Sequence, residues 1–345
     1  MARPDLERSS KMSDSGMTRR KFVRETAIAA AGIAVGLGAA GKKAQAGQVD
    51  TSKILNYNPD MEYRRQGKTN LMFSAVCLGG HSRSNAEQRY EIVSRCIDAG
   101  INYIDACTAG EVRRDAKALR GRRDKMYLSL SHCGHEVRNE NYRTSKKLLE
   151  VLDGLLKDSG EEYTDLWRIT CYEPGGRHTF NTACEVMDAL EKAKKQGKAR
   201  LIGFSTHDRR WIKFMIEYFP QVDCVCFPFT TMSRRAPKDS LFEALKKCDV
   251  GSFGIKPFAA ASLFTGNRKE NDERARLAIR YILASNTVIP IPGMNSLDQV
   301  DNVVKAVKER RQFDVKERAE LDKAARQTWA ALPKNYQWLK DWRYV

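Results

Sequence analysis

The segment SHCGHE, at positions 131–136, holds the densest group of side chains that could bind a metal ion. Imidazole, thiol and carboxylate groups of this kind are ligands that suit zinc and other transition metals. The candidate metal ligands are His132, Cys133 and His135. Their spacing matches no established metal motif, so ordinary histidines of a surface loop are the simpler interpretation.

A second candidate is Asp105, which ends the apolar stretch 101–104 and is followed by small side chains and a thiol. A carboxylate at the end of a buried strand often marks a functional site. Burial as small apolar residues is the simplest role for the chain's cysteines, but a thiol- or metal-dependent site is an alternative. A disulfide such as Cys133–Cys171 is another. The thiols at or near predicted strand ends are Cys77, Cys107, Cys133, Cys171 and Cys226.

These candidates follow short apolar segments that alternate with amphipathic ones from Met61 onwards, which predicts alternating strands and helices. Eight such units within about 250 residues predict a closed parallel (β/α)8 barrel. A doubly wound sheet would carry a glycine-rich phosphate loop after its first strand, and CLGGHSRSNAEQ is a poor match. In a barrel, function gathers at the carboxyl ends of the strands. The predicted strands are 73–80, 102–105, 126–131, 165–170, 200–205, 223–228, 251–257 and 287–293.

Six blocks, in this order and spacing, resemble the aldo-keto reductase superfamily. The resemblance covers roughly residues 61–308 and implies a (β/α)8 barrel that binds NADP(H) without a Rossmann motif and reduces carbonyls. The blocks are YRRQGKTNLMFSAVCLGG (63–80), AGINYIDA (99–106), GRRDKMYLSL (121–130), YTDLWRI (163–169), KKQGKARLIGFSTH (194–207) and VIPIPGMNSLDQVDN (288–302).

The resemblance implies an altered catalytic site. In the family a tyrosine acts as general acid, a lysine and an aspartate lower its pKa, and a histidine orients the carbonyl. Asp105 matches the aspartate. The tyrosine position holds Ala109 or a neighbour, the lysine position aligns with Ser131, and the histidine position aligns with Thr170. Three of the four groups are therefore expected to be absent.

Tyr172 lies two residues beyond the position of the missing histidine, in the segment TCYEPGG. It is a candidate for a displaced general acid, and the neighbouring Glu173 could polarise its hydroxyl group. An ordinary loop tyrosine is the alternative interpretation.

The resemblance also assigns a cofactor site. Ser205 and Thr206 match the positions that hold the nicotinamide carboxamide, and Phe229, in the place of a tyrosine, could stack on a ring. A lysine in the place of Lys256 lies near the cofactor in relatives. The segment before the last predicted helix offers backbone N–H groups to an anion. Gln299 stands in place of an arginine that often binds the 2′-phosphate in the family, so the cofactor could be NADP or NAD. The remaining positions are Gly293, Met294, Asn295, Ser296 and Asn302.

Residues 1–46 are typical of a cleavable export signal, with the arginine pair Arg19–Arg20, an Ala/Gly-rich run at 26–41 and AQA at 44–46. The arginine pair resembles a twin-arginine signal, so we expect the twin-arginine translocase as a partner and a periplasmic or otherwise exported protein. That pathway carries folded proteins, which agrees with loading of a cofactor in the cytoplasm. The remaining chain divides into a barrel over 47–310 and a C-terminal helix with an aromatic tail over 311–345, which we expect to pack on the barrel.

The formal net charge is +17, but charges of both signs alternate along the predicted helices, as on a solvated helix face. No nucleic-acid motif and no stretch of 18 apolar residues occurs, so a small-molecule substrate is the expected partner, with no stable membrane span. Three functions are open: an exported reductase-like enzyme with an altered site, a non-catalytic barrel that binds a ligand or partner, and a metal- or thiol-dependent enzyme.

Overall fold

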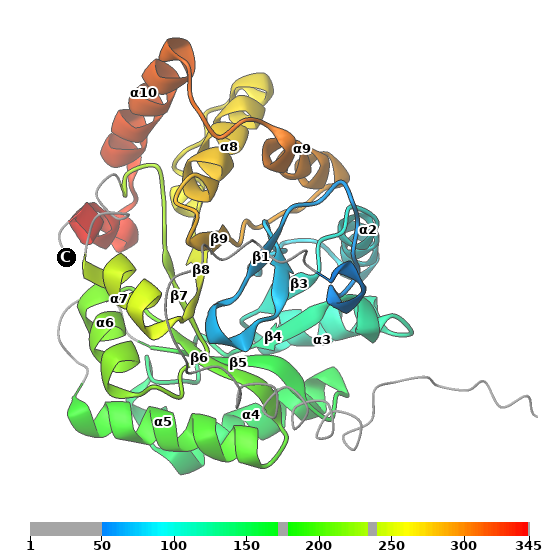
Figure 1. Ribbon diagram of the computed structural model, residues 1–345, viewed down its shortest axis with the longest axis vertical. Helices are drawn as coiled ribbons and strands as arrows, with labels where there is room; N and C mark the ends of the chain where they lie inside the picture. The colour runs from blue at the N-terminus through cyan, green and yellow to red at the C-terminus, as the bar shows by residue number, and fades with distance from the viewer. Residues whose placement is uncertain (1–49, 172–178, 234–239, 344–345) are drawn as a thin grey trace, which may run out of the picture.

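The computed structural model describes residues 50–171, 179–233 and 240–343, so the expected export signal, Tyr172 and Glu173 lie outside the described residues. Parallel strands form one curved sheet in chain order, with helices around it (Figure 1). The strands are β3 (Tyr103–Ala106), β4 (Tyr127–Leu130), β5 (Thr164–Thr170), β6 (Ala199–Ser205), β7 (Cys224–Pro228), β8 (Gly251–Ile255) and β9 (Val288–Pro290).

The segment after β2 closes this sheet into a barrel. β1 (Tyr63–Arg65) and β2 (Met72–Ser74) form an antiparallel hairpin, so the predicted first strand at 73–80 begins too early. The Leu78 N–H donates to the carbonyl of β3 residue Tyr103 at 3.0 Å, and the Cys77 N–H donates to the carbonyl of the last β9 residue at 3.1 Å. The predicted (β/α)8 barrel is confirmed, with a very short first strand.

Successive strand residues point alternately into the barrel and out towards the helices, as the pleat of a strand requires. Outward residues such as Ile104 and Val225 join the core beneath the helices. Cys77, Cys224 and Cys226 lie among the inward residues and are fully buried, so they act as small apolar side chains there. The inward core consists of Phe73, Cys77, Tyr103, Tyr127, Leu166, Leu201, Cys224, Cys226, Phe253, Ile289 and Ile291.

Most of the described helices begin at a side chain that accepts a hydrogen bond from the first turn, as N-cap residues do. Thr108 caps α3 by accepting the Glu111 N–H at 3.3 Å, which places Glu111 close behind the end of β3. No described helix is long and apolar enough to cross a membrane. The helices are α2 (Ala86–Asp98), α3 (Ala109–Leu119), α4 (Ser145–Ser159), α5 (Phe180–Lys195), α6 (Arg209–Tyr218), α7 (Ser240–Cys248), α8 (Arg268–Leu283), α9 (Leu297–Lys308) and α10 (Val315–Ala331).

After α10 the 3-10 helix η7 (Lys334–Arg343) returns to the barrel (Figure 1). The ring of Trp338 stacks on His207, with centroids 3.9 Å apart. The Lys256 ammonium lies 5.3 Å from the ring centroid of Tyr336. His207 follows β6 and Lys256 follows β8, so the aromatic tail covers part of the carboxyl-end face of the barrel.

Candidate functional site

Asp105 lies at the carboxyl end of β3 and is bound by an arginine on another strand. The Arg168 side chain, from β5, donates from Nε to Oδ1 at 3.0 Å and from Nη2 to Oδ2 at 2.8 Å. Both side chains are about 95% buried. Burial disfavours the guanidinium cation, but the Asp105 carboxylate outweighs this and holds the pKa of Arg168 well above its usual range. The pair is therefore a fixed, buried ion pair.

Small side chains on β4 leave room for Arg168 to reach across to β3. Ser129 lies between Asp105 and Leu166 in the sheet register, and Ser131 follows β4. The Arg168 Nη2 also donates to Ser131 Oγ at 3.1 Å. Sequence reasoning missed Arg168, although a charged residue within the fully buried strand DLWRIT demands a buried carboxylate nearby.

Thr170 ends β5 and, like Arg168, occupies an inward position. Its N–H donates at 2.6 Å to Oε2 of Glu136, a fully buried residue whose pKa is raised by burial. The structure therefore places the sequence-predicted Asp105, Ser131 and Thr170 at the carboxyl end of three neighbouring strands. None of the three supplies a phenol, an ammonium or an imidazole.

One phenol does contact the Asp105 carboxylate. The Tyr103 hydroxyl donates to Oδ1 at 3.3 Å. Burial raises the pKa of Tyr103 well above its usual value, and the side chain is 0% exposed. A weaker acid that no substrate can reach is a poor general acid. Among the described residues, no other tyrosine and no lysine or histidine bonds Asp105.

The predicted metal site at His132, Cys133 and His135 is not supported. The rings of His132 and His135 stack face to face, with centroids 4.1 Å apart, and His135 stacks in turn on Tyr142. In the part of the chain that the structure describes, the ligand atoms of these three residues do not gather as a metal would require. The alternative of a Cys133–Cys171 disulfide is wrong, because all nine cysteines are free and Cys171 is fully buried.

A different group of ligand-type side chains does converge, just beyond Asp105. His81 Nε2 lies 3.3 Å from Cys107 Sγ, and that sulfur lies 3.4 Å from Glu111 Oε2. Burial and the neighbouring carboxylates of Asp105 and Glu111 raise the pKa of the Cys107 thiol well above its usual value. Sequence reasoning named Cys107 among the thiols near strand ends but did not connect it with His81 and Glu111.

The predicted nicotinamide positions divide into two groups. Ser205 and Thr206, at the end of β6, are buried, and Lys256 is half-buried after β8 with a left-handed φ of 55°. Phe229 is fully buried and packs against Phe242 of α7 and Tyr281 of α8. Its ring therefore faces the helices, an arrangement that does not favour stacking on a cofactor at the mouth.

The predicted phosphate positions around the start of α9 bond to one another. Asn295 Oδ1 accepts from Ser82 Oγ at 3.1 Å, which joins the loops after the first and last barrel strands. Gln299 Oε1 accepts the Asn295 N–H at 2.7 Å, and Ser296 caps the helix. Met294 is fully buried. A Cβ on Gly293 would lie 3.4 Å from the carbonyl of Gly80. The first barrel loop thus lies directly beside the segment assigned to the cofactor.

Asn302 lies farther along α9 and bonds to the neighbouring helix. It accepts from Arg276 at 2.8 Å and donates to the carbonyl of Asp272 at 3.0 Å. Its amide therefore joins α8 to α9. A contact between Asn302 and the cofactor stays a prediction.

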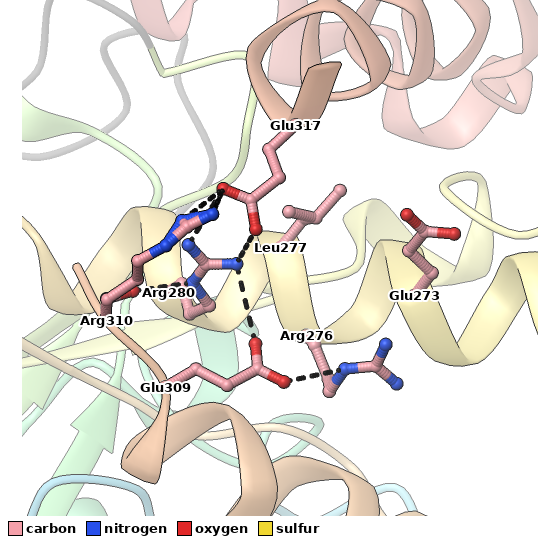
Figure 2. A pocket seen from close by; sticks show the side chains of 7 residues that line it. All are labelled: Glu273, Arg276, Leu277, Arg280, Glu309, Arg310 and Glu317. Atoms are coloured by element: carbon pink, nitrogen blue, oxygen red, sulfur yellow. Dashed lines mark hydrogen bonds and ion pairs between the residues drawn. The ribbon is translucent and has the colours of Figure 1, made fainter. Parts of the chain in front are cut away.

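A cavity of about 270 Å³ lies between α8, the end of α9 and the start of α10 (Figure 2). Its arginines and glutamates face one another: Arg280 bonds to Glu317 at 2.7 Å, and Arg276 approaches Glu309 to 3.1 Å. Arg280 also donates to the carbonyls of Arg310 and Gln312. These bonds pin the connection between α9 and α10. The cavity is therefore a structural junction on the helical layer and not the site at the strand ends.

Comparisons with known proteins agree with this geometry. The aldo/keto reductase family model matches residues 75–276, which is more than half of the chain. The chain belongs to the aldo/keto reductase family.

Solved aldo-keto reductases share the fold of this family member. The holo form of AKR11C1 from Bacillus halodurans has a TM-score of 0.61 and 21% identity over 80% of this chain and 99% of that one. An enzyme from Klebsiella pneumoniae, in complex with NADP and acetate, has a TM-score of 0.58 and 20% identity over 76% and 95%. Among curated proteins, the L-galactose dehydrogenase of Arabidopsis thaliana is 22% identical over 72% of this chain and 89% of that protein.

Proposed function

We propose that this member of the aldo/keto reductase family is an exported oxidoreductase that transfers hydride between a nicotinamide dinucleotide and a carbonyl or alcohol substrate. Its proton-handling groups differ from those of the family. The observation that carries the proposal is the position of Asp105, which stays at the barrel mouth while its carboxylate is bound by Arg168 in place of a lysine and a tyrosine. A neutralised carboxylate cannot tune an acid as the family's aspartate does.

The donor groups near the ends of β6 and β8 fit a dinucleotide in part. Ser205 supplies a hydroxyl group suited to a carboxamide, and the Lys256 ammonium suits an anionic phosphate. The cofactor, when bound, would supply or accept the hydride. Gly293, Asn295 and Ser296 precede α9, whose N-terminal dipole favours an anion. Because Gln299 stands in place of an arginine, we expect weak discrimination between NADP and NAD.

The residues around Asp105 are suited to hold charge and to exclude water from the barrel mouth, and less suited to move protons. Arg168 stays cationic and orients Ser131 through its Nη2 bond. Thr170 is nearly buried beside it. The dehydrogenase from Arabidopsis acts on L-galactose by its name, so sugars are the first alcohol substrates to test.

Cofactor binding is the primary test. NADPH and NADH are titrated into the purified chain while tryptophan fluorescence is followed, since Trp338 stacks beside the end of β6. We expect quenching with a dissociation constant between about 1 μM and 1 mM, the usual range for enzyme substrates. Ser205→Ala and Lys256→Ala should weaken binding, and Lys192→Ala on the far side of α5 should not.

If neither dinucleotide binds, the oxidoreductase proposal fails and the non-catalytic barrel takes its place. If a dinucleotide binds, turnover is measured with sugars and small aldehydes by absorbance of the reduced cofactor. Asp105→Asn is then expected to lower substrate turnover while cofactor binding persists, because Asp105 lies on β3 and the cofactor contacts lie on β6 to α9.

Export is tested separately. The chain is produced with its own residues 1–46 and with Arg19 and Arg20 both replaced by lysine. The wild-type signal should deliver the protein outside the cytoplasm, and the double variant should be retained inside, because the translocase requires the arginine pair. Equal export of both forms would contradict the twin-arginine assignment and leave the enzyme assignment intact.

A further inference from the structure

We propose that His81, Cys107 and Glu111 bind one divalent transition-metal ion of the zinc class at the mouth of the barrel. The three residues come from the loop after the first barrel strand, the end of β3 and the first turn of α3. One nitrogen, one sulfur and one carboxylate oxygen all lie within 4.8 Å of one another. Zinc and its chemical neighbours accept this mixed ligand set.

The separations already fit a common metal centre. Metal–ligand bonds of about 2.0 to 2.3 Å in a tetrahedron place the ligand atoms about 3.3 to 3.8 Å apart. The observed Nε2–Sγ distance is 3.3 Å, and the Sγ–Oε2 distance is 3.4 Å. Small adjustments of the exposed His81 side chain would complete the arrangement.

The carboxylate is held in position by the main chain. Glu111 Oε1 accepts the Ser82 N–H at 3.1 Å, and Oε2 accepts the Cys107 N–H at 3.0 Å. Each oxygen keeps a second lone pair. A Cβ on Gly80 would lie 3.0 Å from Glu111 Oε2 and 3.1 Å from Cys107 Sγ, so glycine is needed for this close packing. Outer hydrogen bonds of this kind orient ligands at metal sites.

The cluster lacks a cation of its own. Glu111 is 3% exposed and forms no ion pair with any residue of the described ranges, 50–171, 179–233 and 240–343. The nearby Arg89 is bonded to Asp115, and Arg114 donates to the Ser82 carbonyl. Buried charges are normally paired or coordinate metals. A divalent ion would balance the carboxylate and stabilise the Cys107 thiolate.

The site is open on one side. His81 is exposed and has a left-handed φ of 57°, a strained conformation for a side chain other than glycine. Three protein ligands with an accessible fourth position are typical of catalytic zinc. Cys107 lies two residues after Asp105, where the family has its catalytic acid nearby. If the proposed function holds, the ion would polarise a substrate oxygen there; the binding site itself stands without that function.

The test uses cobalt(II) and zinc(II) added to the reduced, metal-free full chain. We expect one ion per chain by equilibrium dialysis, and a thiolate-to-cobalt charge-transfer band in the near ultraviolet. Cys107→Ala should abolish the band. His81→Ala removes a direct ligand and should weaken binding at least about tenfold, since loss of an outer-shell partner alone costs that much. Cys133→Ser and His132→Ala are matched controls from the neighbouring loop and should bind as the wild type does.

His81→Ala keeps the result interpretable, since this exposed side chain is not needed for the core and circular dichroism can verify its fold. Absence of stoichiometric binding, or unchanged binding in both Cys107→Ala and His81→Ala, would overturn the proposal. So would loss of binding in Cys133→Ser with Cys107→Ala unaffected. These readouts need no dinucleotide, so their failure is distinct from failure of the proposed oxidoreductase activity.

Discussion

Two regions of the molecule contain buried arginines bound by carboxylates, and they differ in how their charges balance. The cavity between α8, α9 and α10 is lined by three arginines and three glutamates, and two of the glutamates, Glu309 and Glu317, bind the arginines (Figure 2). At the barrel mouth, Arg168 meets Asp105, and Glu111 lies nearby without a cation among the described residues. The charges of the cavity balance one another, and its hydrogen bonds hold the connection between α9 and α10 in place. The mouth has a carboxylate, a thiol and an imidazole left over for a ligand.

This difference distinguishes a structural ion pair from a site that binds a ligand. Arg280 donates to two carboxylates and two main-chain carbonyls, so its charge and its hydrogen-bonding groups are used within the fold. Glu111 has only N–H and thiol partners. A buried negative group without a counter-charge indicates a bound cation more strongly than a paired one does.

The largest expected effect comes from breaking the pair at the mouth. Arg168→Met leaves the Asp105 carboxylate buried and uncompensated, which should lower the free energy of unfolding by about 3–5 kcal/mol. Urea denaturation measures it. Arg113→Met, which removes an exposed ion pair between α3 and Asp158 of α4, is the control and should cost less than about 1 kcal/mol. The double variant Arg168→Met, Asp105→Leu should recover much of the loss; if it does not, the ion pair is not the cause.

The second-largest expected effect is stabilisation by zinc, which should depend on the barrel mouth and not on the cavity. At a free concentration of 100 times its dissociation constant, zinc should raise the free energy of unfolding of the wild type by about 2.7 kcal/mol. The ion should have little effect on Glu111→Gln, because a neutral amide is a poor ligand. Glu309→Gln makes the same change in the cavity and should keep the full response. A zinc response that depends on Glu309 and not on Glu111 would reverse the comparison.

A smaller effect is expected in the cavity. Arg280→Met leaves Glu317 and Glu309 without their buried partner, but both glutamates are about one quarter exposed and can be rehydrated. We expect a loss of about 2 kcal/mol in the free energy of unfolding. Dinucleotide and metal binding should be unchanged, since the cavity lies in the helical layer. Weaker binding at the mouth would show that the two regions are coupled.

The smallest expected effect is the pH dependence of stability that His207 causes. Burial, with Lys256 and Arg138 nearby, holds the pKa of His207 well below its ordinary 6.5, so the folded chain keeps this imidazole neutral. Only the unfolded chain takes up the proton, and stability should therefore fall as the pH drops below about 6.5, by at most about 1.4 kcal/mol per pH unit. His207→Phe keeps a ring against Trp338 and should remove this slope. Parallel unfolding curves for both proteins from pH 7.5 to about 5 would contradict the assignment.

The contribution of the cavity to stability should change with pH only at lower pH values. The hydrogen bond from Arg280 is the main cause that lowers the pKa of Glu317 below its ordinary 4.5. Its contribution to stability is present above that value and is lost as the pH falls further. Glu317→Gln should therefore lower the free energy of unfolding at neutral pH, and its difference from the wild type should shrink in strong acid.

Much of the fold could be predicted from the sequence because it rests on local signals. Apolar segments of strand length, with amphipathic segments between them, predicted the eight units of the barrel in order. The first strand was placed too early, since Phe73 and Ser74 belong to the β1–β2 hairpin and the sequence pattern alone cannot tell pairing partners apart. Asp105, Ser131 and Thr170 were placed correctly at strand ends because parallel strands share one carboxyl end.

The contacts at the site could not be predicted in the same way. The metal ligands were sought in the densest local cluster, His132 to His135, whose rings stack on each other. Sequence proximity does not place ring nitrogens around a common point. The group that does converge joins His81, from the loop after the first barrel strand, to Cys107 and Glu111, from the end of β3 and the first turn of α3. Arg168 reaches across the intervening strand β4 to Asp105.

The sequence by itself determined the order of strands and helices, and it predicted that the family's aspartate is retained at Asp105 while its other catalytic side chains are absent at the matching positions. Side-chain type and periodicity are local properties, so they can be read along the chain. Only the tertiary structure decided what faces Asp105 and which ligand atoms lie together. Those answers depend on barrel register, on small side chains such as Ser129 that leave space, and on how charges separated by tens of residues balance inside the fold.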